Sequence, residues 1–396
     1  MNFENKKISE LNIELIDGDR GKNYPKNEEI TEKGYCLFLN AKNVTSNDFN
    51  FNELNYISED KDKILRNGKA KRRDIILTTR GTVGNIAYYS EKIPYNNIRI
   101  NSGMIIIRCS DQINEKYLYW YMKSKIFQNQ IKELQTGSAQ PQLPISIIKN
   151  MNVRICEKHL QNKIVTILDT IQQKIDLNIH TNNNLYEIGK ALYQEYFENE
   201  EYTNNYEIRQ LREVTTNNRN KIGQTKEYKV LSAVNTGNLV LSDDYFDKQV
   251  YSKDIGKYLN VNKNDFAYNP ARINIGSIGL NTFDFNCCVS PVYVTFSVDK
   301  DYIDFFDFYF KSKRFNAEVT LKASGSVRQA LNYNDFGMIE IPYPTKEMIE
   351  KFNSSYKTIK ERININKTKI SNLEQLRDTL LPKLMNGEID LDKIEV

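Results

Sequence analysis

The stretch IDLNIHTNNNLYEIGKALYQEYF, residues 175–197, decides the fold of this chain. Its apolar or small residues recur at alternating spacings of three and four, which is the period of a coiled-coil helix. The same stripe carries Asn178 and Asn182 where a buried helix should carry Leu or Ile. The sequence therefore predicts a long helix whose apolar stripe is interrupted by amides.

The sequence contains an internal duplication. The segment KSKIFQNQIKELQTGSAQPQLP begins at Lys123, and KSKRFNAEVTLKASGSVRQALN begins at Lys311, which gives an offset of 188. Upstream, TTRGTVGNIA and NPARINIGSI align Arg80 with Arg272 at an offset of 192, and loop deletions account for such a drift. Because the offset holds across several motifs, we conclude that a globular part followed by a helix is duplicated.

The long helix has a partner in the second repeat. Adding 188 to the positions of the first stripe gives a second stripe over residues 352–384, so a second long helix is predicted. A narrow stripe of this kind is buried most economically against another helix of the same kind. If the two pair antiparallel, position numbers across the seam sum to about 548, and Asn182 faces Asn366.

Facing amides can satisfy each other, whereas a shifted register would leave them against apolar side chains. Asn178, Asn182 and Asn366 are therefore candidates for fixing the register of the coiled coil at some cost in stability. The alternative is a polar patch in mid-helix that is open to water.

The rest of each repeat reads as mixed, strand-rich globular structure. Short β-branched runs bounded by Gly, Asn or Pro, such as DIILTTRG and SPVYVTFSV, predict strands, and residues 116–134 and 302–323 look like amphipathic helices. We expect an α+β fold with two similar globular parts, each followed by a long helix, the two helices pairing as an antiparallel coiled coil. The predicted boundaries are a globular part over 1–157, a helix over 158–198, a globular part over 203–343, a helix over 345–386 and a tail over 387–396.

Composition excludes several classes of protein. No apolar run approaches the length of a membrane span, and the start of the chain has no apolar h-region. The five cysteines are odd in number and form no CxxC pair, which argues against a disulfide framework or zinc site and favours a reducing cytoplasm. The two histidines are too few for a clustered catalytic site. The formal net charge of +4 is mild, so nucleic-acid binding would have to rest on local basic patches.

The closing segment LRDTLLPKLMNGEI (376–389), the GSAQPQLP run (137–144) and the duplicated layout resemble the specificity subunit of bacterial type I restriction–modification systems. This resemblance covers essentially the whole chain. It implies that each globular part is a target recognition domain that reads one half of a split sequence in double-stranded DNA. The run GSAQPQLP becomes GSVRQALN in the second repeat, as different half-sites would require.

The same resemblance implies the partners of the chain. The helices would form a spacer and a docking surface for two methyltransferase subunits, which in turn recruit the restriction motor and nuclease subunits. The chain would then be the non-catalytic recognition subunit of a multisubunit adenine methyltransferase and restriction endonuclease. From the residues alone, a rod of roughly 50 Å could hold two domains at about the 34–36 Å that separates half-sites on one face of DNA.

Basic and amide side chains concentrate where such domains would meet DNA. The run at 69–73 could neutralise phosphates, and its alternative is a solvated loop; NNRNK at 217–221 could do the same or read bases. Arg and Gln suit bidentate base contacts, although Arg80 and Arg272 have a structural alternative because they lie beside equivalent glycines. The candidate DNA-binding residues are Lys69, Lys71, Arg72, Arg73, Arg80, Gln140, Gln142, Asn218, Arg219, Lys221, Arg272, Arg328 and Gln329.

Catalytic motifs are missing from the sequence. The run Asn269-Pro270-Ala271-Arg272 is the nearest match to the tetrapeptide of an amino-methylating enzyme, but it lacks the second proline and the aromatic residue. No Gly-rich loop offers a cofactor cradle, and no GKT or GKS triplet offers a phosphate loop. We therefore expect no cofactor, no metal and no catalytic residue. The alternative function is a coiled-coil scaffold or assembly protein that does not read DNA.

Overall fold

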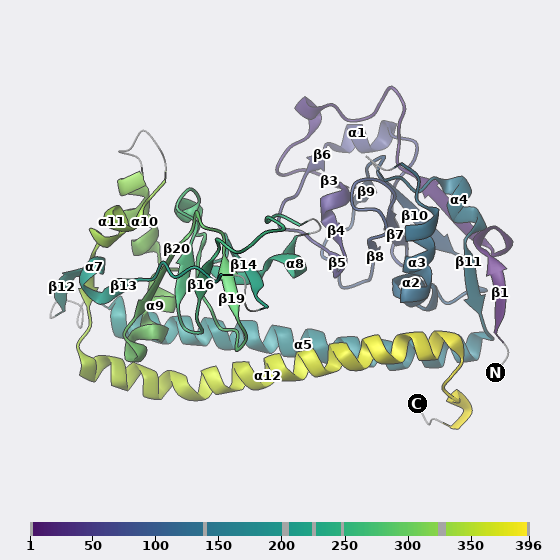
Figure 1. Ribbon diagram of the computed structural model, residues 1–396. Helices are drawn as coiled ribbons and strands as arrows, with labels where there is room; N and C mark the ends of the chain where they lie inside the picture. The colour runs from purple at the N-terminus through teal and green to yellow at the C-terminus, as the bar shows by residue number, and fades with distance from the viewer. Residues whose placement is uncertain are drawn as a thin grey trace. The chain divides into compact units, whose positions relative to one another are not determined.

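The computed structural model describes residues 3–137, 141–199, 206–223, 227–246, 249–323 and 330–393. Three predicted site residues, Gln140, Arg328 and Gln329, lie outside these ranges. The chain divides into two compact units, unit 1 (Met1–Ile179 with Thr368–Val396) and unit 2 (His180–Lys367). Each unit combines one globular part with a stretch of both long helices (Figure 1).

Unit 1 is built on a four-stranded antiparallel sheet in the order β2-β10-β7-β8, with a three-stranded sheet β6-β3-β9 in which β3 and β9 run parallel. Alternate residues of the central strands face two cores. Ile75 and Ile105 pack with the helices, whereas Ile76 and Ile106 pack with the three-stranded sheet. Burial on both faces explains why β7 and β10 read as continuous apolar runs.

The strands of unit 1 are β1 (Glu4–Lys7), β2 (Ile13–Asp17), β3 (Cys36–Leu39), β4 (Val44–Thr45), β5 (Asp48–Phe49), β6 (Tyr56–Ile57), β7 (Ile75–Thr78), β8 (Ile86–Tyr88), β9 (Ile98–Ile100), β10 (Met104–Cys109) and β11 (Asn152–Ile155). Its short helices are α1 (Glu59–Ile64), α2 (Glu115–Lys123), α3 (Lys125–Leu134) and α4 (Ile145–Asn150), with 3₁₀ turns η1 (Ile8–Glu10), η2 (Asn27–Glu29), η3 (Ala41–Asn43) and η6 (Leu391–Lys393).

Unit 2 repeats the four-stranded antiparallel sheet of unit 1. Its antiparallel sheet has the order β13-β20-β17-β18, and a second sheet, β15-β14-β19-β16, again contains one parallel pair, β14 with β19. In both units a two-stranded pair joins the first strand to the strand before a long helix, β1 with β11 and β12 with β21. The predicted duplication of the globular part is therefore confirmed by the strand order of the four-stranded sheet and by the two-stranded pair, whereas the second sheets differ.

The strands of unit 2 are β12 (Glu207–Gln210), β13 (Thr215–Asn217), β14 (Lys229–Val234), β15 (Asn238–Leu241), β16 (Leu259–Val261), β17 (Phe266–Tyr268), β18 (Ile278–Leu280), β19 (Cys287–Val289), β20 (Val294–Val298) and β21 (Glu340–Tyr343). Its short helices are α7 (Leu211–Val214), α8 (Ser242–Tyr245), α9 (Ile303–Tyr309), α10 (Lys313–Ala323) and α11 (Tyr333–Gly337), with 3₁₀ turns η4 (Ile273–Ile275) and η5 (Lys300–Tyr302).

The two long helices, α5 (Lys158–Phe197) and α12 (Lys346–Asn386), pack antiparallel within each unit. In unit 1, Nη1 of Arg377 donates to Oε1 of Gln172 at 2.8 Å. In unit 2, Gly189 takes a position in the apolar stripe of α5 because α12 passes close by. A Cβ at Gly189 would lie 2.6 Å from Cε2 of Tyr356. The predicted antiparallel coiled coil is therefore confirmed.

The amides of the stripe have different partners. Nδ2 of Asn366, a residue only 2% exposed, donates to Oδ1 of Asn182 at 3.0 Å across the helix pair. Asn178 instead donates to the carbonyl of Lys174 in its own helix at 2.7 Å. We propose that the Asn182–Asn366 contact sets the register of the pair in unit 2.

Substitution of these amides should be non-additive. Asn366→Leu should lower the free energy of unfolding by about 1–3 kcal/mol, because it leaves the partly buried amide of Asn182 without its partner. Adding Asn182→Leu should recover most of that loss, since an apolar pair replaces a polar one. Asn178→Leu is the matched control and should change stability by less than about 0.5 kcal/mol. Additive effects of Asn182→Leu and Asn366→Leu in denaturant unfolding would contradict the register role.

Three local features differ from, or refine, the sequence prediction. The helices predicted over 116–134 and 302–323 are each divided in two, at Ser124 and at Ser312, which are equivalent positions at the repeat offset of 188. Ser124 has extended backbone (φ −65°, ψ 151°) and its Oγ donates to the carbonyl of Tyr121 at 2.6 Å. α12 continues through Pro382 and ends at Asn386, where Gly387 takes φ +71°. Among the helices of the described ranges, none is long and apolar enough to cross a membrane.

Candidate nucleic-acid interface

The ends of two strands bring polar loops together at one edge of the sheet in unit 1. β2 and β7 are both antiparallel to β10, so they run in the same direction and their carboxyl ends meet at the same edge. Residues 18–22 follow β2, and residues 79–84 follow β7. The loop that ends at Gln142 joins this edge, since the backbone N–H of Leu143 donates to the carbonyl of Thr79 at 3.0 Å. We call these loops the strand-end surface of unit 1.

The turn at residues 18–22 is fixed by contacts with the backbone of distant loops. A Cβ at Gly18 would lie 2.1 Å from the carbonyl oxygen of Asn101, so only glycine fits there. The carboxylate of Asp19 accepts the backbone N–H of Gly21 and that of Arg66, each at 2.8 Å. The hydrogen bond from Gly21 is the main reason that the pKa of Asp19 lies below its ordinary value. This anchoring leaves the side chain of Arg20 at the surface.

Basic and amide side chains line a small pocket on the strand-end surface. The pocket has a volume of about 160 Å³, and Arg20, Arg80 and Gln142 contribute to its wall. Arg20 also pairs with Asp17 at 3.0 Å. Gln142 is fixed through its backbone, because it exchanges two hydrogen bonds with Thr136, at 2.8 and 2.9 Å. The remaining lining residues are Asp17, Thr79, Ile105, Leu143, Pro144 and Ile145.

Unit 2 has an equivalent strand-end surface. β13 and β17 are both antiparallel to β20, so residues 218–221 and 269–276 follow strands that end at the same edge. The N–H of Leu331 donates to the carbonyl of Pro270 at 3.0 Å, as Leu143 does to Thr79 in unit 1. Gly84 and Gly276 both adopt positive φ, +100° and +85°, so the turns after β7 and β17 share a backbone shape that favours glycine.

The cations of this second surface are free within the described part of the chain. The side chains of Arg219, Lys221 and Arg272 are exposed, and none of them makes a hydrogen bond or ion pair with a described residue. Asn218 is less available, because its side chain hydrogen-bonds to the carboxylate of Asp265.

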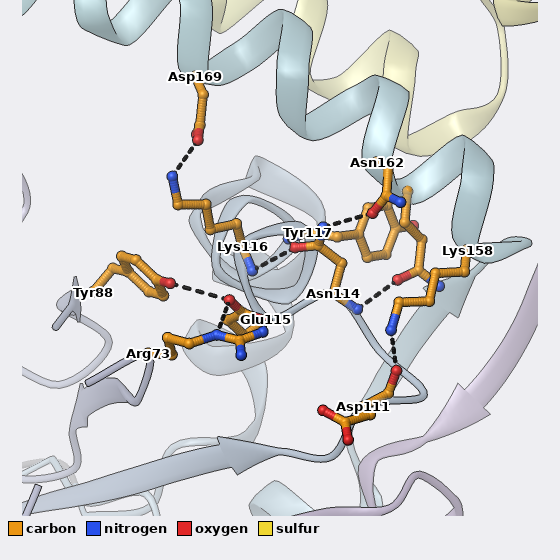
Figure 2. Close-up of polar contacts among 11 residues, drawn as sticks. Arg73, Tyr88, Asp111, Asn114, Glu115, Lys116, Tyr117, Lys158, Asn162 and Asp169 are labelled. Atoms are coloured by element: carbon orange, nitrogen blue, oxygen red, sulfur yellow. Dashed lines mark hydrogen bonds and ion pairs between the residues drawn. The ribbon is translucent and has the colours of Figure 1, made fainter. Parts of the chain in front are cut away.

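The run at 69–73 lies elsewhere and is mostly engaged inside unit 1. It precedes β7, so it lies at the opposite end of that strand from Arg80. Arg72 donates to the carbonyls of Ser90 and Ile93, at 2.7 and 2.9 Å. Arg73 forms a bidentate pair with Glu115, at 2.7 and 2.9 Å (Figure 2).

Lys69 also has an internal partner. It pairs with the buried carboxylate of Asp62, which accepts Nε of Arg99 as well. Burial raises the pKa of Asp62, but the hydrogen bonds from Lys69 and Arg99 outweigh burial and hold that pKa below its ordinary value. Lys71 is the member of the run whose ammonium has no described partner. A phosphate role for the run therefore stays a prediction that rests mainly on Lys71.

Two cations of the strand-end surface were not among the residues predicted from the sequence. Arg20 and Lys22, in GDRGK after β2, occupy the place that Arg219 and Lys221, in NNRNK, take after β13. The motif was available as a signal, because a basic turn follows equivalent strands in both repeats. In the described ranges, no group of three or more His, Cys, Asp or Glu side chains could hold a metal ion.

Comparison with known proteins shows which proteins this chain is similar to. Residues 2–187 match the family described as Type I restriction modification DNA specificity domain. The chain is 23% identical over 347 residues to the type I restriction enzyme MjaIX specificity subunit of Methanocaldococcus jannaschii, covering 81% of this chain and 78% of that protein. The resemblance predicted from the sequence is confirmed.

Two further relatives agree with this result. Over 184 residues the chain is 24% identical to the type I restriction enzyme HindI specificity subunit of Haemophilus influenzae, which covers 46% of this chain and 39% of that protein. A crystal structure of the S subunit of a type I restriction–modification system from M. genitalium shares the fold, with a TM-score of 0.53 at 16% identity over 97% of this chain and 96% of that one. By sequence and by fold, the chain is therefore similar to type I specificity subunits.

Proposed function

We propose that this chain is the sequence-reading subunit of a type I restriction–modification complex. Each unit would bind one half of a bipartite target in double-stranded DNA through its strand-end surface. The observation that carries the proposal is the duplication of that surface. Arg80 and Arg272 follow equivalent strands, and in both units a basic turn follows the strand on the other side of the central strand β10 or β20.

The chemistry of the surface suits both parts of DNA recognition. Arg and Lys on exposed turns neutralise phosphates and so position a protein on the duplex. An Arg or Gln held by a fixed backbone can make bidentate contacts to base edges in the major groove. Gln142 and Arg80 meet this description in unit 1, as does Arg272 in unit 2. The two surfaces differ in sequence, which supports two different half-sites.

The proposed complex places chemistry outside this chain. Two methyltransferase subunits would dock on the long helices, and the restriction motor and nuclease subunits would join through them. The support is the symmetry of exposed apolar residues on the helices. Leu177 matches Ile365 at the repeat offset of 188, as Ile188 matches Leu376, and all four are between 46% and 64% exposed. Repeated exposed positions suit two copies of one partner.

Removal of the free cations should weaken DNA binding in a salt-dependent way. Arg219→Ala with Lys221→Ala should lower affinity for all sequences alike and reduce the salt slope by up to about 0.9 for each lost phosphate contact. Arg272→Ala should cost about 1–3 kcal/mol and relax one position of the target if it reads a base. Lys71→Ala tests the 69–73 run in the same assay.

The control and the deciding outcome are simple. Lys357→Ala removes an exposed cation from α12 and should leave the salt slope unchanged. Binding is measured by gel shift over a range of salt concentrations, for the chain alone and with its methyltransferase partner. If the Arg219, Lys221 and Arg272 variants all bind as the wild type does, the strand-end surface does not bind DNA, and the scaffold alternative gains.

A further inference from the structure

In each unit one short helix makes a charged contact with the long helix that follows the globular part, and the two contacts have opposite charge patterns. α2 in unit 1 begins at Glu115 and α9 in unit 2 begins at Ile303. These positions match at the repeat offset of 188, so the two helices are the same element of the repeat. Their polar contacts to the long helices can therefore be compared position by position.

In unit 1 the short helix carries the cation. Lys116 of α2 forms an ion pair with Asp169 of α5, and Nε1 of Trp120 donates to the same carboxylate at 2.9 Å. Just before α2, Nδ2 of Asn114 donates to Oδ1 of Asn162 at 2.8 Å. Figure 2 shows Lys116 and Asn114 directed toward α5 from the start of α2. The side chain of Asp169 is 19% exposed, so its charge is partly shielded from water and needs a partner.

In unit 2 the short helix carries the anion. Position 304 corresponds to 116, and there Asp304 of α9 accepts Nζ of Lys360 of α12 at 2.5 Å. The side chain of Asp304 is 19% exposed, as is that of Asp169. In repeat numbering Asp169 corresponds to Lys357 and Gln172 to Lys360, so this turn of α12 carries two lysines where α5 carries an aspartate and a glutamine.

The reversal has a consequence for a duplicated chain. If the globular part of unit 1 docked on α12, Lys116 would meet Lys357 and Lys360. If the polar face of α9 met the equivalent turn of α5, Asp304 would meet Gln172 in place of Lys360, with Asp169 one helical turn away. Like charges at a partly desolvated contact are repulsive, and repulsion against the wrong partner is an effective source of specificity.

We propose that this charge-reversed pair is a key that directs each globular part to its own stretch of the long helices during folding. Similar domains and similar helices in one chain invite exchanged pairing, and the ion pairs oppose it. The inference rests only on contacts within each unit and does not depend on DNA binding.

The test gives the ion pairs of both units the same charge pattern in the full-length chain, so that the two keys are equal. Lys116→Asp with Asp169→Lys gives unit 1 the charge pattern of unit 2 while keeping an ion pair, so the folded protein should unfold only a few degrees below the wild-type Tm, because Trp120 loses its acceptor. After denaturation, however, this chain should lose refolding yield, because exchanged docking is no longer repelled. Adding Asp304→Lys with Lys360→Asp makes the keys opposite again and should restore the yield. Refolding is followed by the fraction that regains the wild-type unfolding transition.

Single variants separate keying from ordinary stabilisation. Lys116→Asp alone places acid against acid and should lower Tm by about 2–4 °C more than the neutral Lys116→Gln. That excess should shrink at high salt. If the equal-key chain refolds as completely as the wild type, or if Lys116→Asp and Lys116→Gln behave alike, the key does not exist.

Discussion

Exchange of residues 203–343 for the equivalent part of a related specificity subunit is expected to change one half of the methylated target and leave the other half intact. Unit 2 has its own sheet, its own core and its own strand-end surface, so its reading face travels with the exchanged segment. The half read by unit 1 should persist, because Arg20, Arg80 and Gln142 are not touched.

The chimera is measured by sequencing of methylated DNA from cells that express it with its partners. The subunit that supplies the exchanged segment should carry Asp or Glu at the position of Asp304, since its partner Lys360 lies in α12, outside that segment. Control chimeras exchange residues 1–157 instead and should change the opposite half. A folded chimera in which both halves change together would show that the units do not read independently.

Charged substitution at the exposed apolar positions of the helices should abolish assembly with the methyltransferase subunits. Ile188→Lys with Leu376→Lys replaces side chains that are 51% and 46% exposed, so the fold should tolerate the change. If these residues anchor the partner, each substitution should cost more than about 2 kcal/mol of binding free energy. If both sites contribute to one contact, the double variant should lose at least about a thousandfold in affinity. Co-purification with the methyltransferase measures the effect.

The matched control adds the same charges elsewhere on the same helices. Asn183→Lys with Ser371→Lys alters exposed polar residues that are also equivalent in the two repeats, and assembly should survive. A Tm within a few degrees of wild type shows that each variant is folded. If the Ile188→Lys, Leu376→Lys variant assembles normally, the methyltransferase binds another surface of the chain.

Local patterns predicted a large share of this fold. The period of the stripe at 164–196 and its copy at 352–384 predicted the paired helices, and Asn182 and Asn366 do face each other. Apolar runs such as IILT and MIII marked the central strands, because residues buried on both faces leave no polar alternation. These features depend on near neighbours in the sequence or on an exact internal copy.

Contacts between distant residues limited the prediction of the site. Arg72 and Arg73 look like free cations in the sequence, but their partners lie 18 to 42 residues away and only the folded sheet reveals them. Arg20 and Lys22 were missed because the offset to Arg219 and Lys221 is 199, larger than the 188 to 192 seen elsewhere. The offset changes because more residues separate β2 from β7 than separate β13 from β17. The break at Ser124 depends on hydrogen bonds rather than on apolar period.

The most direct test of the central claim is a genome-wide map of methylated adenines in the host with and without this gene. The account predicts that one bipartite motif, two fixed halves separated by unspecified bases, is methylated in the wild type and disappears on deletion. Retention of every methylated motif after deletion, or loss of a continuous motif, would contradict the proposal that two recognition units of this chain read two separate half-sites.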